Sequence, residues 1–135
     1  MCYHNLYNSW AWLGGHVDGD SNLKRVILKE IKEESGISDI KFLSEDIFSL
    51  EILTVSGHIK RGKYISSHLH LNVTFLLEAD TNVKLSIKPD ENSGLEWINV
   101  EDISIKSTEK WFIDNIYSKL TEKVKTIKFL LKNVK

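Results

Sequence analysis

The sequence predicts an α/β sandwich, in which a mixed sheet lies between two helices. Apolar residues recur with helical spacing over residues 23–35 and 109–132, and they alternate with polar residues between residues 63 and 79. Amphipathic helices and strands bury their apolar faces by packing on one another in layers. With 135 residues, the chain is expected to form a single domain over residues 1–135.

Composition excludes several classes of protein. A net charge of −1, with 27% charged and 41% hydrophobic residues, is typical of an ordinary globular chain and offers no electrostatic case for a nucleic-acid or membrane surface. The one cysteine, Cys2, excludes an internal disulfide and a cysteine-rich metal site. No apolar run approaches ~20 residues, and the amino terminus lacks the blocks of a signal peptide. We therefore expect a cytoplasmic protein.

The aromatic segments at residues 1–7 and 10–13 predict two short strands around an Asn-Ser turn. Trp10 and Trp12 alternate with Ala11 and are expected on the same side, where they either join the core or stack on a nucleobase. Residues 14–37 then read as a glycine-rich turn followed by a helix. Asn22 is the expected N-cap and Gly36 the expected terminator.

Three carboxylates occupy one side of this predicted helix. Glu30, Glu33 and Glu34 lie on an arc that overlaps the apolar arc of the same helix. They repel one another, and they stand where the helix dipole favours cations. An all-oxygen cluster of this kind suits Mg²⁺ or Mn²⁺. The alternative is a solvated acidic face interleaved with Lys29 and Lys32.

The same stretch resembles the Nudix hydrolase signature, G-x5-E-x7-R-E-U-x-E-E-x-G-U, in which U is a bulky aliphatic residue. Seven of its nine fixed slots match in register over residues 15–37. The matching residues are Gly15, Glu30, Ile31, Glu33, Glu34, Gly36 and Ile37. Two slots depart, because Ser21 stands for the first glutamate, with Asp20 one position early, and Lys29 stands for the arginine.

The resemblance implies a Mg²⁺-dependent hydrolase that cleaves a diphosphate bond in a nucleoside diphosphate linked to another moiety. It implies Glu30, Glu33 and Glu34 as metal ligands, with Glu30 or Glu33 also handling the proton. The Gly14–Gly15 turn is expected to bind substrate through its amides. The alternative is a weakly active or inactive nucleotide sensor, motivated by Ser21 and Lys29.

Nudix domains usually carry one or two more strands before the glycine turn than thirteen residues supply. The resemblance therefore implies a sheet trimmed at this end, or a chain that begins at an internal methionine. A trimmed sheet exposes an edge, and an exposed edge invites pairing with another chain. A homodimer is expected on this ground.

Beyond the helix, residues 40–43 form a short apolar segment, and residues 47–59 and 63–79 predict two long strands joined by a basic hairpin loop that contains Arg61. Leu69 and Leu71 share one face of the second strand, and His68 and His70 share the other, which is expected to meet solvent or a wet cleft. We expect the two histidines and Arg61 to contact the substrate. The alternatives are an exposed polar strand face, a transition-metal pair at His68 and His70, and a loop that is basic only for solubility.

The remaining segments complete the expected fold. Residues 84–88 and 95–100 predict short strands around an acidic turn at residues 88–94, and residues 101–105 form a connector. In Nudix domains an acidic residue of this region sometimes serves as base or extra metal ligand, which makes Glu91, then Asp90, then Glu96 candidates. A final helix over residues 109–132, capped by Ser107 or Thr108, is expected to pack on the sheet rather than on a membrane.

Overall fold

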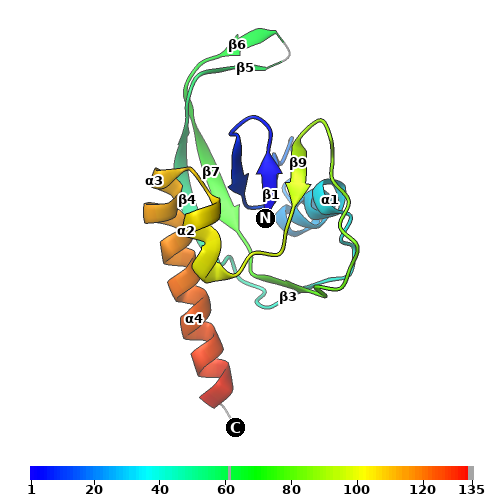
Figure 1. The fold of residues 1–135 in the computed structure, drawn as a ribbon, viewed down its shortest axis with the longest axis vertical. Helices are drawn as coiled ribbons and strands as arrows, with labels where there is room; N and C mark the ends of the chain where they lie inside the picture. Colours follow the sequence, from blue (N-terminus) through cyan, green and yellow to red (C-terminus); the bar gives the residue numbers. More distant parts are fainter. Residues whose placement is uncertain (61, 134–135) are drawn as a thin grey trace. The chain divides into compact units, whose positions relative to one another are not determined.

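The computed structural model describes the backbone of residues 1–60 and 62–133, and the side chains of residues 1–59 and 62–128. The chain divides into two compact units, and each is described by itself. The first unit comprises Met1–Asp39 and Asp80–Lys135, and the second comprises Ile40–Ala79. The fold is a mixture of strands and helices, as the sequence predicts, with strands before and after one helix and the remaining helices at the end of the chain (Figure 1). The described strands pair in several small antiparallel sheets, where one mixed sheet was expected. The single domain and the homodimer stay predictions.

The first unit contains a three-stranded antiparallel sheet. Its strands are β1 (Cys2–His4), β2 (Ser9–Ala11) and β9 (Asn92–Leu95), in the order β2-β1-β9. The two short amino-terminal strands are therefore confirmed, and the turn between them closes with the Asn8 amide 2.9 Å from the His4 carbonyl. Cys2 pairs with Ala11 on one side and Leu95 on the other, which places its side chain in the core.

Two expectations about residues 84–100 are wrong. Residues 84–88 form no strand, because their backbone follows the end of the signature helix, where the Ser86 amide donates to the Ser35 carbonyl at 2.9 Å. The strand expected at residues 95–100 is β9, which begins at Asn92 and ends at Leu95. It begins early because the Asn92 side chain accepts a hydrogen bond from the Lys88 amide at 3.2 Å and thereby fixes the preceding turn.

The carboxyl-terminal part of the first unit is helical. Short turns of helix, η1 (Val100–Asp102) and α2 (Ile103–Lys106), replace the expected connector. The predicted final helix is confirmed in extent as α3 (Lys110–Phe112), a π-helical turn η2 (Ile113–Tyr117) and α4 (Ser118–Asn133). No helix in the described residues is both long and apolar enough to cross a bilayer.

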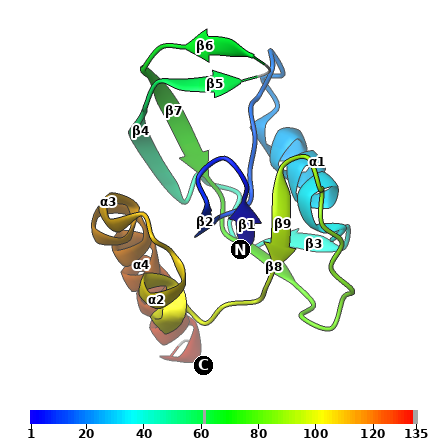
Figure 2. The same ribbon diagram turned by 45° about the horizontal axis from the view of Figure 1, so that its top comes forward.

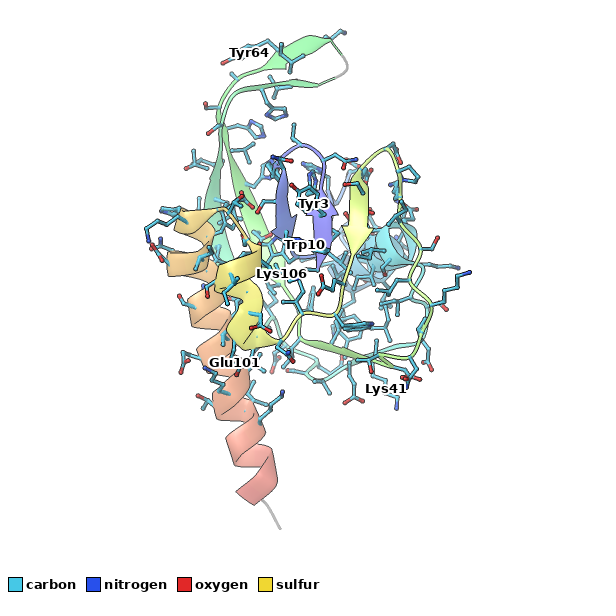
Figure 3. All side chains as sticks on the ribbon, viewed as in Figure 1. Tyr3, Trp10, Lys41, Tyr64, Glu101 and Lys106 are labelled. Carbon is cyan, nitrogen blue, oxygen red and sulfur yellow. The ribbon has the colours of Figure 1, made fainter. Side chains whose placement is uncertain are left out.

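Side chains from both ends of the first unit's sequence pack together. Trp12 meets Phe112 and Tyr117 edge-on, with ring centroids 6.3 and 5.6 Å apart. Trp10 instead meets Tyr3, at 5.7 Å, and the Lys106 ammonium lies 5.5 Å from its ring (Figure 3). Both tryptophans are thus held in intramolecular contacts.

The predicted cap of the final helix differs. The residue before α3 is Glu109, whose side chain makes no capping bond. The Ser107 hydroxyl lies 3.3 Å from the Ser9 hydroxyl, which is 98 residues away in sequence. It also accepts a long hydrogen bond, 3.4 Å, from the Glu109 amide. A contact that distant in sequence carries no local signal.

The second unit consists of three antiparallel strand pairs. They are β3 (Ile40–Phe42) with β8 (Leu77–Ala79), β4 (Ser49–Val55) with β7 (His68–Thr74), and β5 (His58–Lys60) with β6 (Lys63–Ile65). The β5–β6 hairpin continues from the end of the β4–β7 pair (Figures 1 and 2).

The prediction of two unbroken long strands is wrong. Both strands break at small polar residues, 56–57 and 66–67, which have low strand propensity. At this break the Gly57 amide donates to the Ser67 hydroxyl, at 3.0 Å, instead of to a partner carbonyl. The second strand breaks again at residues 75–76, before β8.

The alternation of β7 is confirmed, but the exposure of its faces is reversed. Leu69 and Leu71, on one face of the β4–β7 pair, are 66% and 78% exposed. Glu51 of β4, which lies on the other face with the polar residues of β7, is only 7% exposed. Burial of the polar face is possible because its groups satisfy one another. The Glu51 carboxylate accepts hydrogen bonds from the Ser49 hydroxyl and, at 3.0 Å, from the Asn72 amide.

Candidate active site

The carboxylates belong to α1 (Leu23–Ser35) of the first unit, and both predicted ends of this helix are confirmed. The Asn22 side chain accepts from the Arg25 amide at 3.0 Å. Gly36 ends the helix with φ 77°, a left-handed conformation that glycine adopts without strain. Val26 and Ile31 are buried, so the apolar arc faces the core. The carboxylates on the overlapping arc therefore face partly toward the core.

Glu34 is the most deeply buried carboxylate of the helix, with 3% of its surface exposed. Its Oε2 accepts a hydrogen bond from the Gly14 amide at 2.8 Å. Burial, together with the negative charges of Glu91 and Glu30, raises the pKa of Glu34 to about 7, against the opposing effects of the Gly14 hydrogen bond and the charge of Lys88. Glu34 therefore titrates near neutral pH.

The glycine turn also accommodates Glu30, which is 9% exposed. A Cβ atom at Gly15 would overlap the Glu30 carboxylate and lie 2.9 Å from its Cγ. Gly15 has no positive φ, so its role is close approach rather than backbone freedom. The absence of a side chain at this position lets the carboxylate lie directly against the turn.

Glu33 is more open, with 40% of its side chain exposed, and it lies between two lysines. Lys29 Nζ is 3.7 Å from Glu33 Oε1 and 3.5 Å from Glu30 Oε1. Lys88 Nζ is 3.5 Å from Glu33 Oε2 and 2.8 Å from Glu91 Oε1. Each lysine thus contacts each of its two carboxylates as a point charge, whereas an arginine would present a planar fork with two donors to one carboxylate.

The structure brings Glu91 to this cluster, and Lys88 and Asn92 arrive with it. Sequence reasoning missed the latter two, although it identified the turn that contains them. Asn92 is fully buried, and its Nδ2 donates to the Glu34 carbonyl at 3.1 Å, 58 residues away in sequence. This bond fixes the acidic turn against the end of α1. A polar residue within a turn was the only signal that could have suggested it.

The two departures from the signature have different consequences. Asp20, one position before the Ser21 slot, accepts from Arg25 Nε at 2.8 Å and pairs with its guanidinium. It is therefore bound to Arg25, and Ser21 is exposed. Lys29, by contrast, lies within the carboxylate cluster.

The oxygen donors of this cluster fit a hard divalent ion in chemistry. As the side chains stand, however, no group of three or more His, Cys, Asp or Glu in the described part of the chain is arranged to hold a metal. Glu33 would have to leave Lys29 and Lys88 and turn toward Glu30 and Glu34.

The remaining predicted substrate ligands lie elsewhere in the chain. His68 and His70 are on β7 in the second unit, so the structure does not relate them to the carboxylates. Arg61 lies outside the described residues. Their contact with substrate stays a prediction, as do the roles assigned to the glutamates and glycines.

Taken together, the buried carboxylates on a helix and the glycine turn laid against them, within a mixed α/β fold, are the arrangement that the resemblance to the Nudix signature implies. Comparison with known proteins agrees, since a model of the NUDIX domain matches residues 3–120. The chain belongs to the Nudix family, and its enzyme class is that of a pyrophosphohydrolase.

One curated relative is an RNA pyrophosphohydrolase of Pelagibacter ubique (strain HTCC1062). It is 27% identical over 126 residues, which cover 91% of this chain and 78% of the relative.

Proposed function

We propose that the protein is a Mg²⁺-dependent hydrolase that cleaves a diphosphate bond in a nucleoside diphosphate linked to a second moiety, with Mn²⁺ as a substitute ion. The observation that carries this proposal is the burial of Glu30 and Glu34 against the Gly14–Gly15 turn. Buried carboxylates are unfavourable unless they are protonated, paired or bound to a cation. The arrangement is therefore suited to a charge supplied from outside the chain.

In this proposal Glu30, Glu33 and Glu34 hold the ion, and Glu30 or Glu33 accepts the proton of the attacking water. The water oxygen bonds to phosphorus as the bridging P–O bond breaks, which yields two phosphate products. A bound Mg²⁺ would lower the pKa of the water and neutralise charge on the phosphate oxygens. Lys88, which would keep its ion pair with Glu91 when Glu33 turns to the ion, lies beside the cluster and is proposed to contact a phosphate oxygen.

The relative's name raises a second substrate class. The near-neutral chain charge gave no reason to expect a nucleic-acid partner. RNA nonetheless contains a phosphate anhydride only within its terminal phosphates, because the rest of its backbone is phosphodiester. We include a terminally triphosphorylated RNA as a substrate candidate on the basis of the relative alone. An RNA read only at its end requires no extended basic surface.

The deciding experiment incubates the purified chain with Mg²⁺ and two sets of compounds. One set contains nucleoside diphosphates linked to a sugar, a second nucleotide or another group, and the other contains triphosphorylated oligoribonucleotides. Turnover that Glu33→Gln abolishes supports the enzyme. Ligand-induced stabilisation without product, in both sets, would instead support the sensor alternative and overturn hydrolysis.

A further inference from the structure

Three of the five histidines in the chain lie close together in the second unit. His68 and His70 alternate on β7, and their Nε2 atoms are 2.9 Å apart, with ring centroids separated by 4.8 Å. His58, at the start of β5, places its ring centroid 6.3 Å from that of His68. All three side chains are partly exposed, so an ion in solution can reach them.

The backbone orients two of these rings in the same way. His68 Nδ1 lies 2.8 Å from the Ser66 carbonyl oxygen, and His58 Nδ1 lies 3.0 Å from the Ser56 carbonyl oxygen. A carbonyl oxygen only accepts, so each Nδ1 carries a proton. In the neutral ring the lone pair then resides on Nε2. A carbonyl bound to the far nitrogen is the usual support of a metal-binding histidine.

We propose that His68 and His70, with His58 as a third ligand, bind a transition-metal ion that prefers imidazole, such as Zn²⁺ or Ni²⁺. Two imidazole nitrogens bound at about 2.1 Å to a tetrahedral ion lie roughly 3.4 Å apart, so an ion that replaces the hydrogen bond between His68 Nε2 and His70 Nε2, 2.9 Å long, needs them to separate by only about 0.5 Å. The described residues contain no complete three-ligand group, so His58 must turn inward as the ion binds. Gly57, which precedes His58, lies in the break between β4 and β5.

This site differs in chemistry from the carboxylates of α1. Imidazole favours Zn²⁺, Ni²⁺ and Cu²⁺, whereas Mg²⁺ prefers oxygen. A bound ion would join β5 to β7 across the strand break. There, the Gly57 amide donates a hydrogen bond to the Ser67 hydroxyl. Its consequence would be to fix the β5–β6 hairpin to the β4–β7 pair, which makes the ion a structural element of the second unit.

The test is a calorimetric titration of the full chain with Zn²⁺ at pH 7.5 in excess Mg²⁺, which saturates sites that prefer oxygen. One ion should bind, and His68→Gln or His70→Gln should weaken binding by at least about tenfold, since losing even a supporting partner costs roughly 10–100-fold. His58→Gln should weaken binding less. His16→Gln removes an exposed histidine of the first unit and should change nothing.

A second measurement needs no variant. In ¹H–¹⁵N spectra of the imidazole rings, Zn²⁺ should shift the Nε2 signals of His68 and His70 and leave those of His16 in place. The contrary result is a neutral hydrogen bond between His68 and His70, seen as one Nδ1–H and one Nε2–H tautomer that Zn²⁺ does not alter. That result, or full Zn²⁺ affinity in the His68→Gln, His70→Gln double variant, would overturn the proposal.

Discussion

Glu34 should make the stability of the metal-free protein depend on pH. Its pKa is about 7 in the folded chain against an ordinary value of 4.5, chiefly because the side chain is buried. The folded state therefore binds more protons than the unfolded state between these two values, and stability falls as pH rises through this window. At about 1.4 kcal/mol for each pH unit of difference, the ionised carboxylate costs on the order of 3 kcal/mol above pH 7.

The substitution Glu34→Gln removes this cost. A glutamine oxygen still accepts from the Gly14 amide, so the turn keeps its hydrogen bond. We expect the variant to be more stable than the parent by about 2–3 kcal/mol at pH 8, and to lose most of that advantage at pH 4.5. The appropriate assay is urea unfolding in EDTA at several pH values, with the variant compared with the parent at each.

A matched control is Glu33→Gln, because the Glu33 side chain is 40% exposed and is not among the groups that shift Glu34. The Glu34-dependent slope should persist in this variant. Adding Mg²⁺ should stabilise the parent most above pH 7, where no proton competes with the ion. If parent and Glu34→Gln show the same stability at every pH, the carboxylate is not desolvated and the reasoning is wrong.

Three further substitutions probe the site. Lys29→Arg should raise turnover with little change in metal affinity, because a planar fork fixes Glu30 better than a point charge, and reduced turnover would mean that the site is adapted to lysine. Gly15→Ala should displace the Glu30 carboxylate and cost on the order of a hundredfold in turnover, and thermal unfolding should show a folded protein, whereas unchanged turnover would refute the close approach. Lys88→Gln should tighten Mg²⁺ binding by removing a cation beside Glu33 and should lower turnover, and calorimetry showing weaker binding would contradict that charge argument.

The parts of the fold that the sequence predicted well are those with local causes. A capping asparagine, a terminal glycine and helical spacing lie within a few residues of the atoms they control, so Asn22, Gly36 and the extent of α1 could be inferred. The inward turn of Glu30 and Glu34 followed from the same periodicity, because their arc overlaps that of Val26.

The parts that were missed depend on contacts between distant residues. The Asn92 bond to the Glu34 carbonyl joins elements 58 residues apart, and no local pattern specifies such a partner. Exposure of the two faces of β7 was reversed because polarity was taken as a guide to solvent. Glu51 and Asn72 satisfy each other across two strands, which removes the penalty that the expectation relied on.

The charges around α1 favour a divalent ion over another lysine as the cation of the proposed metal site. Four carboxylates surround the end of the helix. They are Glu30, Glu33, Glu34 and Glu91. Among the described ion pairs, only two ammonium groups contact these carboxylates, those of Lys29 and Lys88, and those pairs do not include Glu34.

Two negative charges therefore remain when all four carboxylates are ionised, and protonation of Glu34 near pH 7 removes one of them. A divalent cation would neutralise both without any proton, and it would do so best above pH 7. Activity that rises through pH 7 in parallel with Mg²⁺ affinity would follow from this balance. Activity independent of pH from 6 to 8 would mean that Glu34 does not control the charge of the site.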